Sequence, residues 1–414
     1  MREEFLKRFL RYVAVPSQSD GKAGKVPSSE GQWDMARLLK GELEELGFQN
    51  LEISEYCVLT GVLPSNLPEG RKAPKIGWCA HMDTVDVGLS PEIHPHVVKN
   101  YQGGDICLNE EKQIFLRVKE HPEIERYKGD DIVVSDGTSV LGADDKSALA
   151  NLLTVLDEVV RENRPHGDIY VAFVPDEEIG LVGSKHLDFS KFPVDYAYTI
   201  DSCELGELVW QSFNAGGGKL EIEGITAHPI SSKGVLVNPT LVAVDFINMM
   251  NRGETPEFTE GTEGFVWVNG VVSSPSHATV TMKIRDHDKK KYESKKAMIR
   301  AAVDYLRVRY PKIKIDLTIE DVYANIADAM TDDNRAGLDN LYRAFEICEI
   351  EPNCIAMRGG TDGSYISTQG ILTPNYFTGG LNFHSNCEFL PLGAAEKSME
   401  VTKALIALAA GEIR

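Results

Sequence analysis

The sequence predicts a protein of the α/β class, in which one α/β domain is interrupted by a small α+β domain. The chain has 414 residues, more than a single hydrophobic core usually serves. Short apolar strands alternate with amphipathic helices in its first half, which is typical of helices layered on a sheet. From about residue 216 the order changes to β-α-β-β-α-β, the order of a ferredoxin-like unit.

The elements of the first part follow from hydrophobic periodicity and from helix start and stop signals. Residues 2–13 and 30–46 have the spacing of amphipathic helices, the second with Ser29 as its N-cap and Gly47 at its end. The other elements that we expect here are one helix, 147–162, and five strands, Leu51–Val58, Ile76–Ala80, 138–141, Ile169–Val174 and Tyr196–Ile200.

The second part and the end of the chain complete the pattern. The expected strands are 217–225, 265–272, 277–284 and 313–320, and the expected helices are 238–251, 288–308, 331–348 and 392–410. These elements predict an inserted domain over residues 214–321. The flanking segments, 1–213 and 322–414, would then form the larger domain.

Composition excludes several classes of function. The net charge of −20 repels phosphate backbones, so we expect no nucleic-acid partner. No apolar run approaches the roughly 18 residues that span a bilayer, and the N-terminal segment does not resemble a secretory signal. Seven cysteines without CxxC spacing indicate reduced thiols, so we expect a cytoplasmic protein with no membrane partner.

Acidic and histidine residues gather just after predicted strands, where open α/β sheets bind ligands. "AHMDT" places His81 and Asp83 after one strand, and "VPDEEIG" places Glu177 and Glu178 after another. Three further motifs, "GADDKS", "TIDS" and "NFHSN", contribute Asp144, Asp201 and His384. Each motif alone has an ordinary structural explanation as a turn or a cap. Together they supply a mixture of imidazole and carboxylate groups that suits zinc.

The pair Asp144-Asp145 needs its own explanation. It stands at a predicted strand-to-helix turn, where one aspartate as a cap is common. Two adjacent carboxylates indicate a bound cation.

These motifs, in this order, resemble those of the co-catalytic dizinc metallopeptidases. The resemblance also includes "VPSSEGQW", "TAHPISSKG", "IRDHD", "MRGGTDGS" and "FTGGLNFH", and extends from about residue 27 to 388. It implies a catalytic domain with a mixed sheet and helices on both faces, interrupted by a ferredoxin-like lid through which the chain forms a homodimer.

The resemblance also implies a role for each motif residue. His81 and Asp201 would hold one zinc ion, Glu178 and His384 a second, and Asp144 would bridge the two, often with a cis peptide bond after it. Glu177 would be the general base and Asp83 would orient His81. The family uses aspartate at position 201 in its aminopeptidases, which favours that activity here.

Four residues of the insert and its neighbourhood would complete the site. By resemblance, His228 would stabilise the oxyanion, and Arg285 and Arg358 would hold the carboxylate end of the substrate. Asn238 matches a family asparagine near the lid. A histidine before Pro229 and an arginine at a strand end also have plain structural explanations.

The resemblance therefore predicts a zinc aminopeptidase that acts on short peptides, with tripeptides as the expected substrates. An N-acyl-amino-acid amidohydrolase, a dipeptidase or a carboxypeptidase on the same fold remains an alternative at this stage. A binding protein with a degenerate site is a third. Cys203, beside Asp201, leaves the choice of metal open.

Overall fold

The computed structural model describes residues 1–413, which divide into two compact units. The first unit contains Met1–Trp210, Ala329–Ile355 and the described residues from Thr361 onward, and the second contains Gln211–Asp328 and Ala356–Gly360. Each unit is described by itself. Within residues 1–413, no helix combines the length and the apolar character needed to cross a lipid bilayer.

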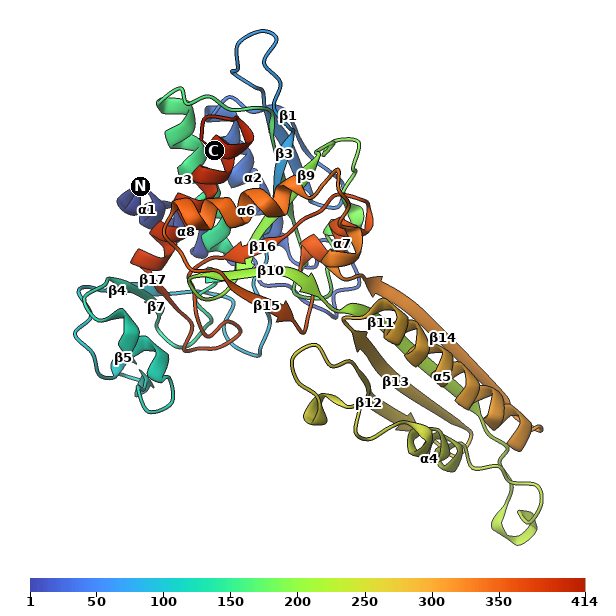
Figure 1. Ribbon diagram of the computed structural model, residues 1–414. Helices are drawn as coiled ribbons and strands as arrows, with labels where there is room; N and C mark the ends of the chain where they lie inside the picture. Colours follow the sequence, from blue (N-terminus) through green and yellow to red (C-terminus); the bar gives the residue numbers. More distant parts are fainter. Residues whose placement is uncertain (414) are drawn as a thin grey trace. The chain divides into compact units, whose positions relative to one another are not determined.

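A mixed eight-stranded sheet forms the centre of the first unit, in the order β1-β2-β8-β3-β9-β16-β10-β15 (Figure 1). Strand β3 pairs in parallel with both β8 and β9, while β2 pairs antiparallel with β8. The strands are β1 (Gln49–Ile53), β2 (Leu59–Leu63), β3 (Ile76–His81), β8 (Ile169–Val174), β9 (Tyr196–Ser202), β10 (Glu207–Ser212), β15 (Asn353–Met357) and β16 (Asn375–Phe377).

Helices cover both faces of this sheet. Trp78 of β3 donates a hydrogen bond to Tyr376 (3.2 Å), whose hydroxyl lies 2.7 Å from that of Thr402 in α8. The next residue, Cys79, lies 3.9 Å from Asp362 in α7. Because successive strand residues point to opposite faces, α7 and α8 cover different faces, as expected. The helices are α1 (Arg2–Val13), α2 (Glu30–Glu45), α3 (Ala143–Arg161), α6 (Ala336–Ile347), α7 (Asp362–Thr368) and α8 (Leu392–Ala409).

Burial explains why β3 holds its place. All six of its residues are buried, and fully burying one large apolar side chain contributes roughly 1.5–3 kcal/mol. Helix α3 packs on β3 and β9 and also against α1 and α8. The carboxyl end of β3 is thereby fixed beside the start of α3.

A smaller three-stranded sheet, in the order β17-β7-β4, was not foreseen from the sequence. Strand β17 pairs antiparallel with β7, and this pairing fixes the loop that leads into β17 and carries His384. Its strands, the hairpin beside it and one 3₁₀ helix are β4 (Pro95–Val98), β5 (Ile106–Asn109), β6 (Ile114–Leu116), β7 (Ile132–Ser135), β17 (Phe389–Pro391) and η1 (Pro122–Tyr127).

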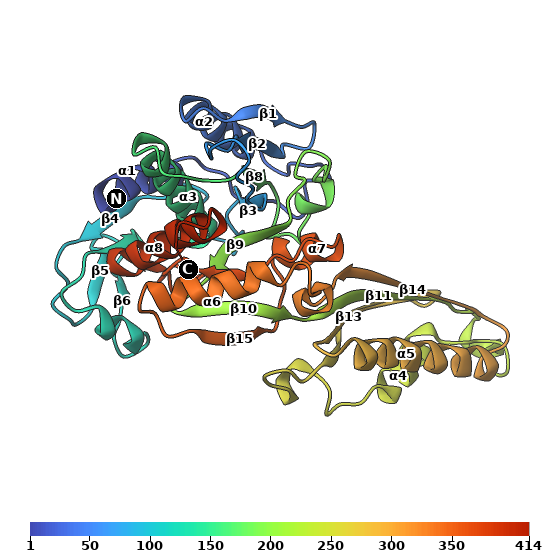
Figure 2. The ribbon, with the colours of Figure 1, turned by 45° about the horizontal axis from the view of Figure 1, so that its top comes forward.

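The second unit has the predicted ferredoxin-like order. Its four strands pair antiparallel in the order β12-β13-β11-β14, and α4 and α5 pack against each other and on β13 (Figure 2). Phe246 of α4, Val280 of β13 and Ile299 of α5 are fully buried in its core. The elements are β11 (Asn214–Glu223), α4 (Pro239–Met249), β12 (Phe265–Ser273), β13 (His277–Asp286), α5 (Lys289–Arg309) and β14 (Lys314–Tyr323).

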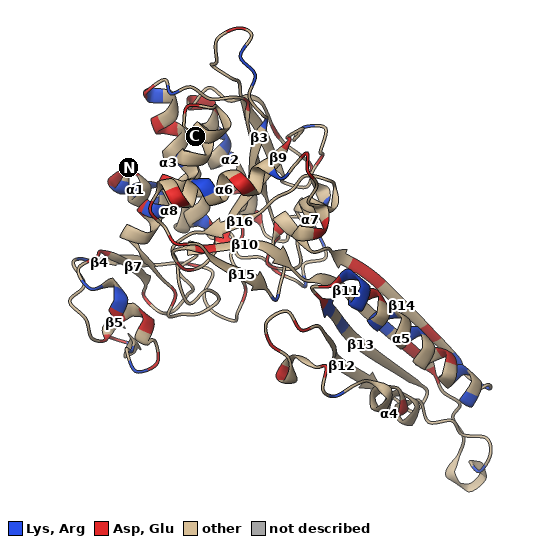
Figure 3. Ribbon diagram, viewed as in Figure 1, with Lys and Arg blue, Asp and Glu red and all other residues tan. Residues whose placement is uncertain are grey.

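Charge also orders the second unit. Basic residues line α5, and acidic residues lie along β14 beside it (Figure 3). Lys296 of α5 donates to the carboxylate of Asp321 in β14 at 2.9 Å, and Asp288 caps the helix by accepting from the Lys291 backbone N–H. The exposed part of this pairing contributes little to stability, and the buried Ile299, Val303 and Leu306 set the face of α5 that meets the sheet.

Two expected strands were wrong. The predicted strand Leu51–Val58 is broken by a turn, because Cys57 has φ of 62° and its N–H donates to the carbonyl of Ser54. Residues 138–141 form a loop, because β7 already ends at Ser135 and the carboxylate of Asp136 accepts from both the N–H and the hydroxyl of Thr138. Such local side-chain bonds favour turns over strands.

Candidate metal centre

Five segments of the first unit bring the predicted site residues together. His81 ends β3, Asp201 is the second-to-last residue of β9, and Glu177 and Glu178 follow β8. Because β8, β3 and β9 are parallel neighbours, their carboxyl ends meet at one edge of the sheet. The other two contributions are Asp144, in the turn that opens α3, and His384, in the loop before β17.

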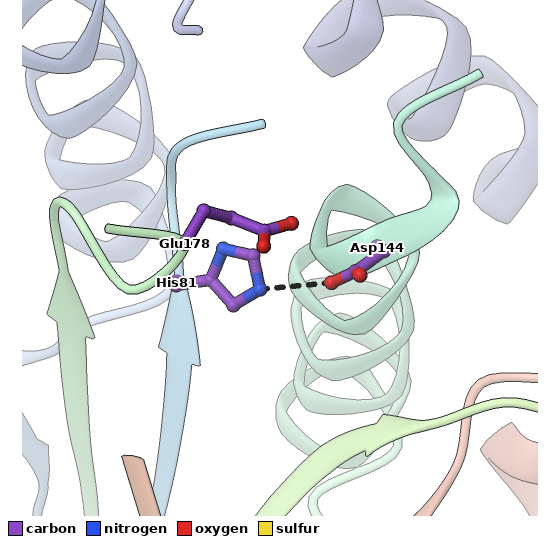
Figure 4. A group of neighbouring side chains, drawn as sticks. All are labelled: His81, Asp144 and Glu178. Atoms are coloured by element: carbon purple, nitrogen blue, oxygen red, sulfur yellow. Dashed lines mark hydrogen bonds and ion pairs between the residues drawn. The ribbon is translucent and has the colours of Figure 1, made fainter. Parts of the chain in front are cut away.

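Asp144 lies at the centre of this cluster. One of its carboxylate oxygens is 2.9 Å from Nε2 of His81, and the other is 3.1 Å from Nε2 of His384. Figure 4 shows His81, Asp144 and Glu178 turned toward one another from three separate segments. Glu178 lies 3.0 Å from His384, and Asp201 lies 3.9 Å from His81.

Two groups of donor atoms lie close enough to hold a cation. Within each group all donor atoms are within 4.8 Å of one another, and the groups are His81 with Asp144 and Glu178, and Asp144 with Asp145 and Asp201. Asp144 belongs to both, which is the position required of a carboxylate shared by two cations. The groups differ from the expected pairing in that Asp145 is included and His81 is grouped with Glu178.

The carboxylates carry more negative charge than the neighbouring side chains balance. Burial, and then the nearby Asp144, raise the pKa of Asp201 well above its usual range and the pKa of Glu178 to about 7. The adjacent lysine does not compensate, because Lys146 directs its Nζ to the carbonyl of Val15 at 2.6 Å. A divalent cation would relieve this repulsion.

The two imidazoles also hold protons that a bound metal ion would displace. Hydrogen bonds with Asp144 and Glu178 raise the pKa of His384 to about 10. Burial alone would lower the pKa of His81, but its bonds to Asp144 and Asp83 raise it well above the ordinary value. Metal binding releases such protons, since the ligand is the neutral imidazole. With the buried Asp145 Oδ1, which has no hydrogen-bond partner, these donors fit a divalent metal.

Asp83 does more than the sequence indicated. Nδ1 of His81 lies 3.1 Å from the carbonyl of Asp83 and 3.4 Å from its carboxylate. The same carboxylate accepts the backbone N–H groups of Glu177 (3.0 Å) and Glu178 (3.2 Å). One buried side chain therefore orients the imidazole and fixes both glutamates.

Sequence reasoning missed how the glutamates are anchored. Asp176, with φ of 56°, accepts from the N–H and the hydroxyl of Ser28 (2.7 and 2.5 Å) and from Gln32 (2.7 Å). Ser28 and Gln32 belong to the motif "VPSSEGQW", which was noted without a role. No sequence signal pairs these residues, because 148 and 144 positions separate the acceptor from Ser28 and Gln32.

Burial raises the pKa of Glu177 well above its usual range, with Asp201 and Asp362 adding to the effect. Glu177 directly precedes Glu178, and the backbone N–H groups of both lie on the same Asp83 carboxylate. The peptide bond between Asp144 and Asp145 is cis, which confirms the cis bond expected from the resemblance.

Burial also raises the pKa of the Cys203 thiol, so this thiol stays protonated beside Asp201.

The remaining predicted residues belong to the second unit. His228 is exposed, and its Nδ1 accepts from the N–H of Ile230. Asn238 caps α4 through a bond from the N–H of Thr240 (3.0 Å). Arg285 donates to the carbonyls of Gly216 and Ile284.

Arg358 lies in the short segment Ala356–Gly360 of the second unit. It donates to the carbonyls of Gly261 and Glu263 and to the hydroxyl of Thr259. Its guanidinium also lies over the rings of Phe213 and Phe265. The cation is therefore held in place by groups of its own unit.

Comparison with known proteins gives consistent results. The sequence model of "Peptidase family M20/M25/M40" matches residues 141–408. The chain is 49% identical to a peptidase T-like protein of Yersinia pestis over 410 residues, covering 99% of this chain and 98% of that one. It is 40% identical to peptidase T of Fusobacterium nucleatum over 404 residues, covering 97% of each chain.

Solved structures show the same fold. Aminopeptidase PepT of Bacillus cereus has a TM-score of 0.76 at 22% identity, with 99% of each chain covered. A dinuclear metal-binding peptidase of the M20 family from Bacillus subtilis has a TM-score of 0.64 at 11% identity, covering 99% of this chain and all of that one.

Proposed function

The chain belongs to peptidase family M20/M25/M40, and from this premise we propose that it is a metal-dependent aminopeptidase. It removes the N-terminal residue from short peptides, chiefly tripeptides. The relatives named peptidase T align over nearly the whole chain at about two residues in five identical, so the resemblance includes both units. The motifs quoted from the sequence had favoured peptidase T within the family.

The observation that carries the proposal is the position of Asp144 between two imidazoles, in both groups of potential metal donors. Such sharing has no purpose in an ordinary helix cap. It suits a pair of cations that act together on one bond.

The metals are proposed to be two zinc ions per subunit. His81 and Asp201 would hold one, Glu178 and His384 would hold the other, and Asp144 would contribute to both. Zinc is favoured because the donors are imidazole nitrogen and carboxylate oxygen atoms. Bound there, the ions supply Lewis acidity that polarises the scissile carbonyl and makes water a better nucleophile near neutral pH.

Glu177 is the proposed general base. It takes the proton of the attacking water and delivers it to the leaving amine. Its raised pKa makes it a stronger base than an exposed glutamate. Asp83 positions it through the hydrogen bond to its backbone N–H.

The second unit supplies the groups that recognise the rest of the substrate. His228 is exposed and therefore accessible to a substrate, on which it stabilises the oxyanion. Arg285 and Arg358 bind the terminal carboxylate, a stronger acceptor than the carbonyls that they contact now. Asn238 is proposed to contribute to the recognition of the substrate as well, and the free α-amine of the substrate is held near the acidic cluster.

The protein is proposed to form a homodimer through the second unit. Strand β12 lies at the edge of its sheet, and Val271 and Val272 on that strand are 46% and 76% exposed. An open edge with apolar side chains favours pairing with a second copy. Val272→Lys should therefore give monomers in sedimentation equilibrium, whereas Val308→Lys, an equally exposed site on α5 (79%), should leave the dimer intact. A dimeric Val272→Lys protein would contradict this interface.

The cytoplasm is the proposed location, since all seven cysteines are free as in reducing compartments. The amidohydrolase, dipeptidase and carboxypeptidase alternatives are not favoured, because the full-length relatives are peptidase T proteins. A non-enzymatic role is opposed by the family membership.

The deciding experiment is hydrolysis of a panel of di-, tri- and tetrapeptides with added zinc. We expect release of the N-terminal residue, fastest from tripeptides, and no hydrolysis of their N-acetylated forms. Release of the C-terminal residue, or cleavage of only the N-acetylated peptides, would overturn the proposal.

A further inference from the structure

Glu388 is a buried carboxylate that has no part in the proposed chemistry. Only 2% of the residue is exposed. One of its oxygens accepts the backbone N–H groups of Leu141 (2.7 Å) and Gly142 (2.9 Å), and the other accepts those of Ala143 (2.8 Å) and Asp144 (3.3 Å). A single side chain thus satisfies four consecutive donors.

The turn needs such an acceptor. The first N–H groups of a helix have no partner within the helix, and here they converge because Gly142 is left-handed, with φ of 75°. A side chain at Gly142 would also press on Thr84 and Ile93, at 3.1 and 3.2 Å from its Cβ. The backbone of this turn is therefore restricted to one shape, which an anion in its concavity stabilises.

The loop that carries Glu388 contacts Asp144 twice. Four residues earlier, His384 directs its Nε2 to the Asp144 carboxylate at 3.1 Å, while Glu388 holds the Asp144 backbone. The loop is itself fixed by the N–H of Glu388 on the carbonyl of Ser385 and by the pairing of β17 with β7. Side chain and backbone of Asp144 are thus set by one short segment.

We propose that Glu388 is a positioning residue that fixes the backbone of residues 141–144, so that the Asp144 carboxylate lies where two metal ions can share it. The inference rests on the proposed metal-dependent function. Without Glu388, four buried N–H groups would lose their acceptor, and Asp144 would no longer be held at its main chain. Residues that orient metal ligands typically affect metal affinity 10–100-fold.

The test is Glu388→Gln, which keeps the shape but turns an amide NH₂ toward two N–H donors. Zinc binding to the metal-free protein would be measured by calorimetry, at a temperature where circular dichroism shows the variant folded. We expect the zinc Kd to rise roughly 10- to 100-fold, and kcat for a tripeptide to fall while KM changes little. Glu388→Asp keeps the charge but is shorter, so its Kd should lie between those of Glu388→Gln and the unmodified protein.

Asn151→Ala is the matched control. Asn151 is buried on the same helix, donates to Ser398 at 2.8 Å and accepts from Thr402 at 2.8 Å, but it does not contact the turn. We expect this variant to melt at a lower temperature with an unchanged zinc Kd. If Asn151→Ala weakens zinc binding as much, or if both Glu388 variants bind zinc normally, the positioning role is wrong.

The two proposals can fail separately. If the unmodified protein binds zinc but cleaves no peptide, while Glu388→Gln loses affinity, the proposed function fails and the positioning role holds. If Glu388→Gln does not fold, the Kd of Glu388→Asp decides, and a normal value contradicts the positioning role.

Discussion

The two units treat their functional candidates in different ways. In the first unit, several carboxylates crowd around two imidazoles, and these two side chains do not balance all of the negative charge. In the second unit, each candidate has an ordinary structural partner. Asn238, for example, accepts the backbone N–H of Thr240, and Arg285 donates to a backbone carbonyl. Charge without a balancing partner indicates a ligand, whereas a satisfied polar group is explained by the fold alone.

The metal-binding roles of the first unit and the substrate-recognition roles of the second therefore rest on different kinds of support. The metal centre is supported by its geometry, in which the Asp144 carboxylate lies 2.9 and 3.1 Å from two imidazoles and belongs to both groups of potential metal donors. The recognition groups of the second unit are supported by resemblance and by their exposure. Experiments that remove one group at a time test this contrast.

The largest effect is expected from removal of the metal. A chelator should abolish hydrolysis, and zinc or cobalt should restore it. At a metal concentration 100 times Kd, binding at one site adds about 2.7 kcal/mol to stability, so the melting temperature of a chain this long should rise by roughly 3–5 °C. Calorimetric melting with and without metal measures this, and an unchanged midpoint together with full activity in chelator would disprove the metal centre.

Loss of the proposed base should be the next largest. Glu177→Ala should lower kcat by roughly 10²- to 10⁴-fold, because no other group is proposed to take the proton of the attacking water. Elemental analysis should still find two metals per chain, since Glu177 is not a ligand. Full turnover by this variant would remove Glu177 from the base role, and lost metal would make it a ligand instead.

His228 tests the second unit directly. His228→Ala should lower kcat by roughly 10²- to 10³-fold, with unchanged metal content, if this imidazole stabilises the oxyanion. His277→Ala is the control, because His277 lies in the same unit and bonds only locally, to Thr279 at 3.1 Å. Equal kinetics for the two variants would mean that His228 is a surface histidine.

The fold and the cluster were predictable from the sequence for specific reasons. Apolar runs such as Ile169–Val174 form β8 with the expected bounds, because a fully buried strand carries a strong signal. The convergence of His81, Glu178 and Asp201 followed because the parallel strands β8, β3 and β9 end at one edge of a sheet, whereas Asp144 and His384 reach the cluster from loops. The predicted α/β fold class was confirmed because buried strands of this kind carry a strong signal in the sequence.

What could not be predicted depends on long-range hydrogen bonds. Nothing near Glu388 in the sequence indicates four donors at residues 141–144, and nothing near Asp176 indicates Ser28 and Gln32. The wrong strand at Leu51–Val58 has a local cause, since the β-branched and apolar residues there favour a strand until Ser54 and Cys57 close a turn. Such bonds are decided by tertiary packing, which periodicity does not report.

The smallest effect is expected at Asn238, where the structural and the functional roles coincide. Asn238→Ala should cost about 1 kcal/mol of unfolding free energy through the lost cap of α4, whereas Asn238→Ser should keep most of it, because serine also caps well. If Asn238 acts only as a cap, KM for a tripeptide should be normal in both variants. A raised KM in the serine variant, with normal stability in urea unfolding, would give Asn238 a part in substrate binding and reduce the contrast between the two units.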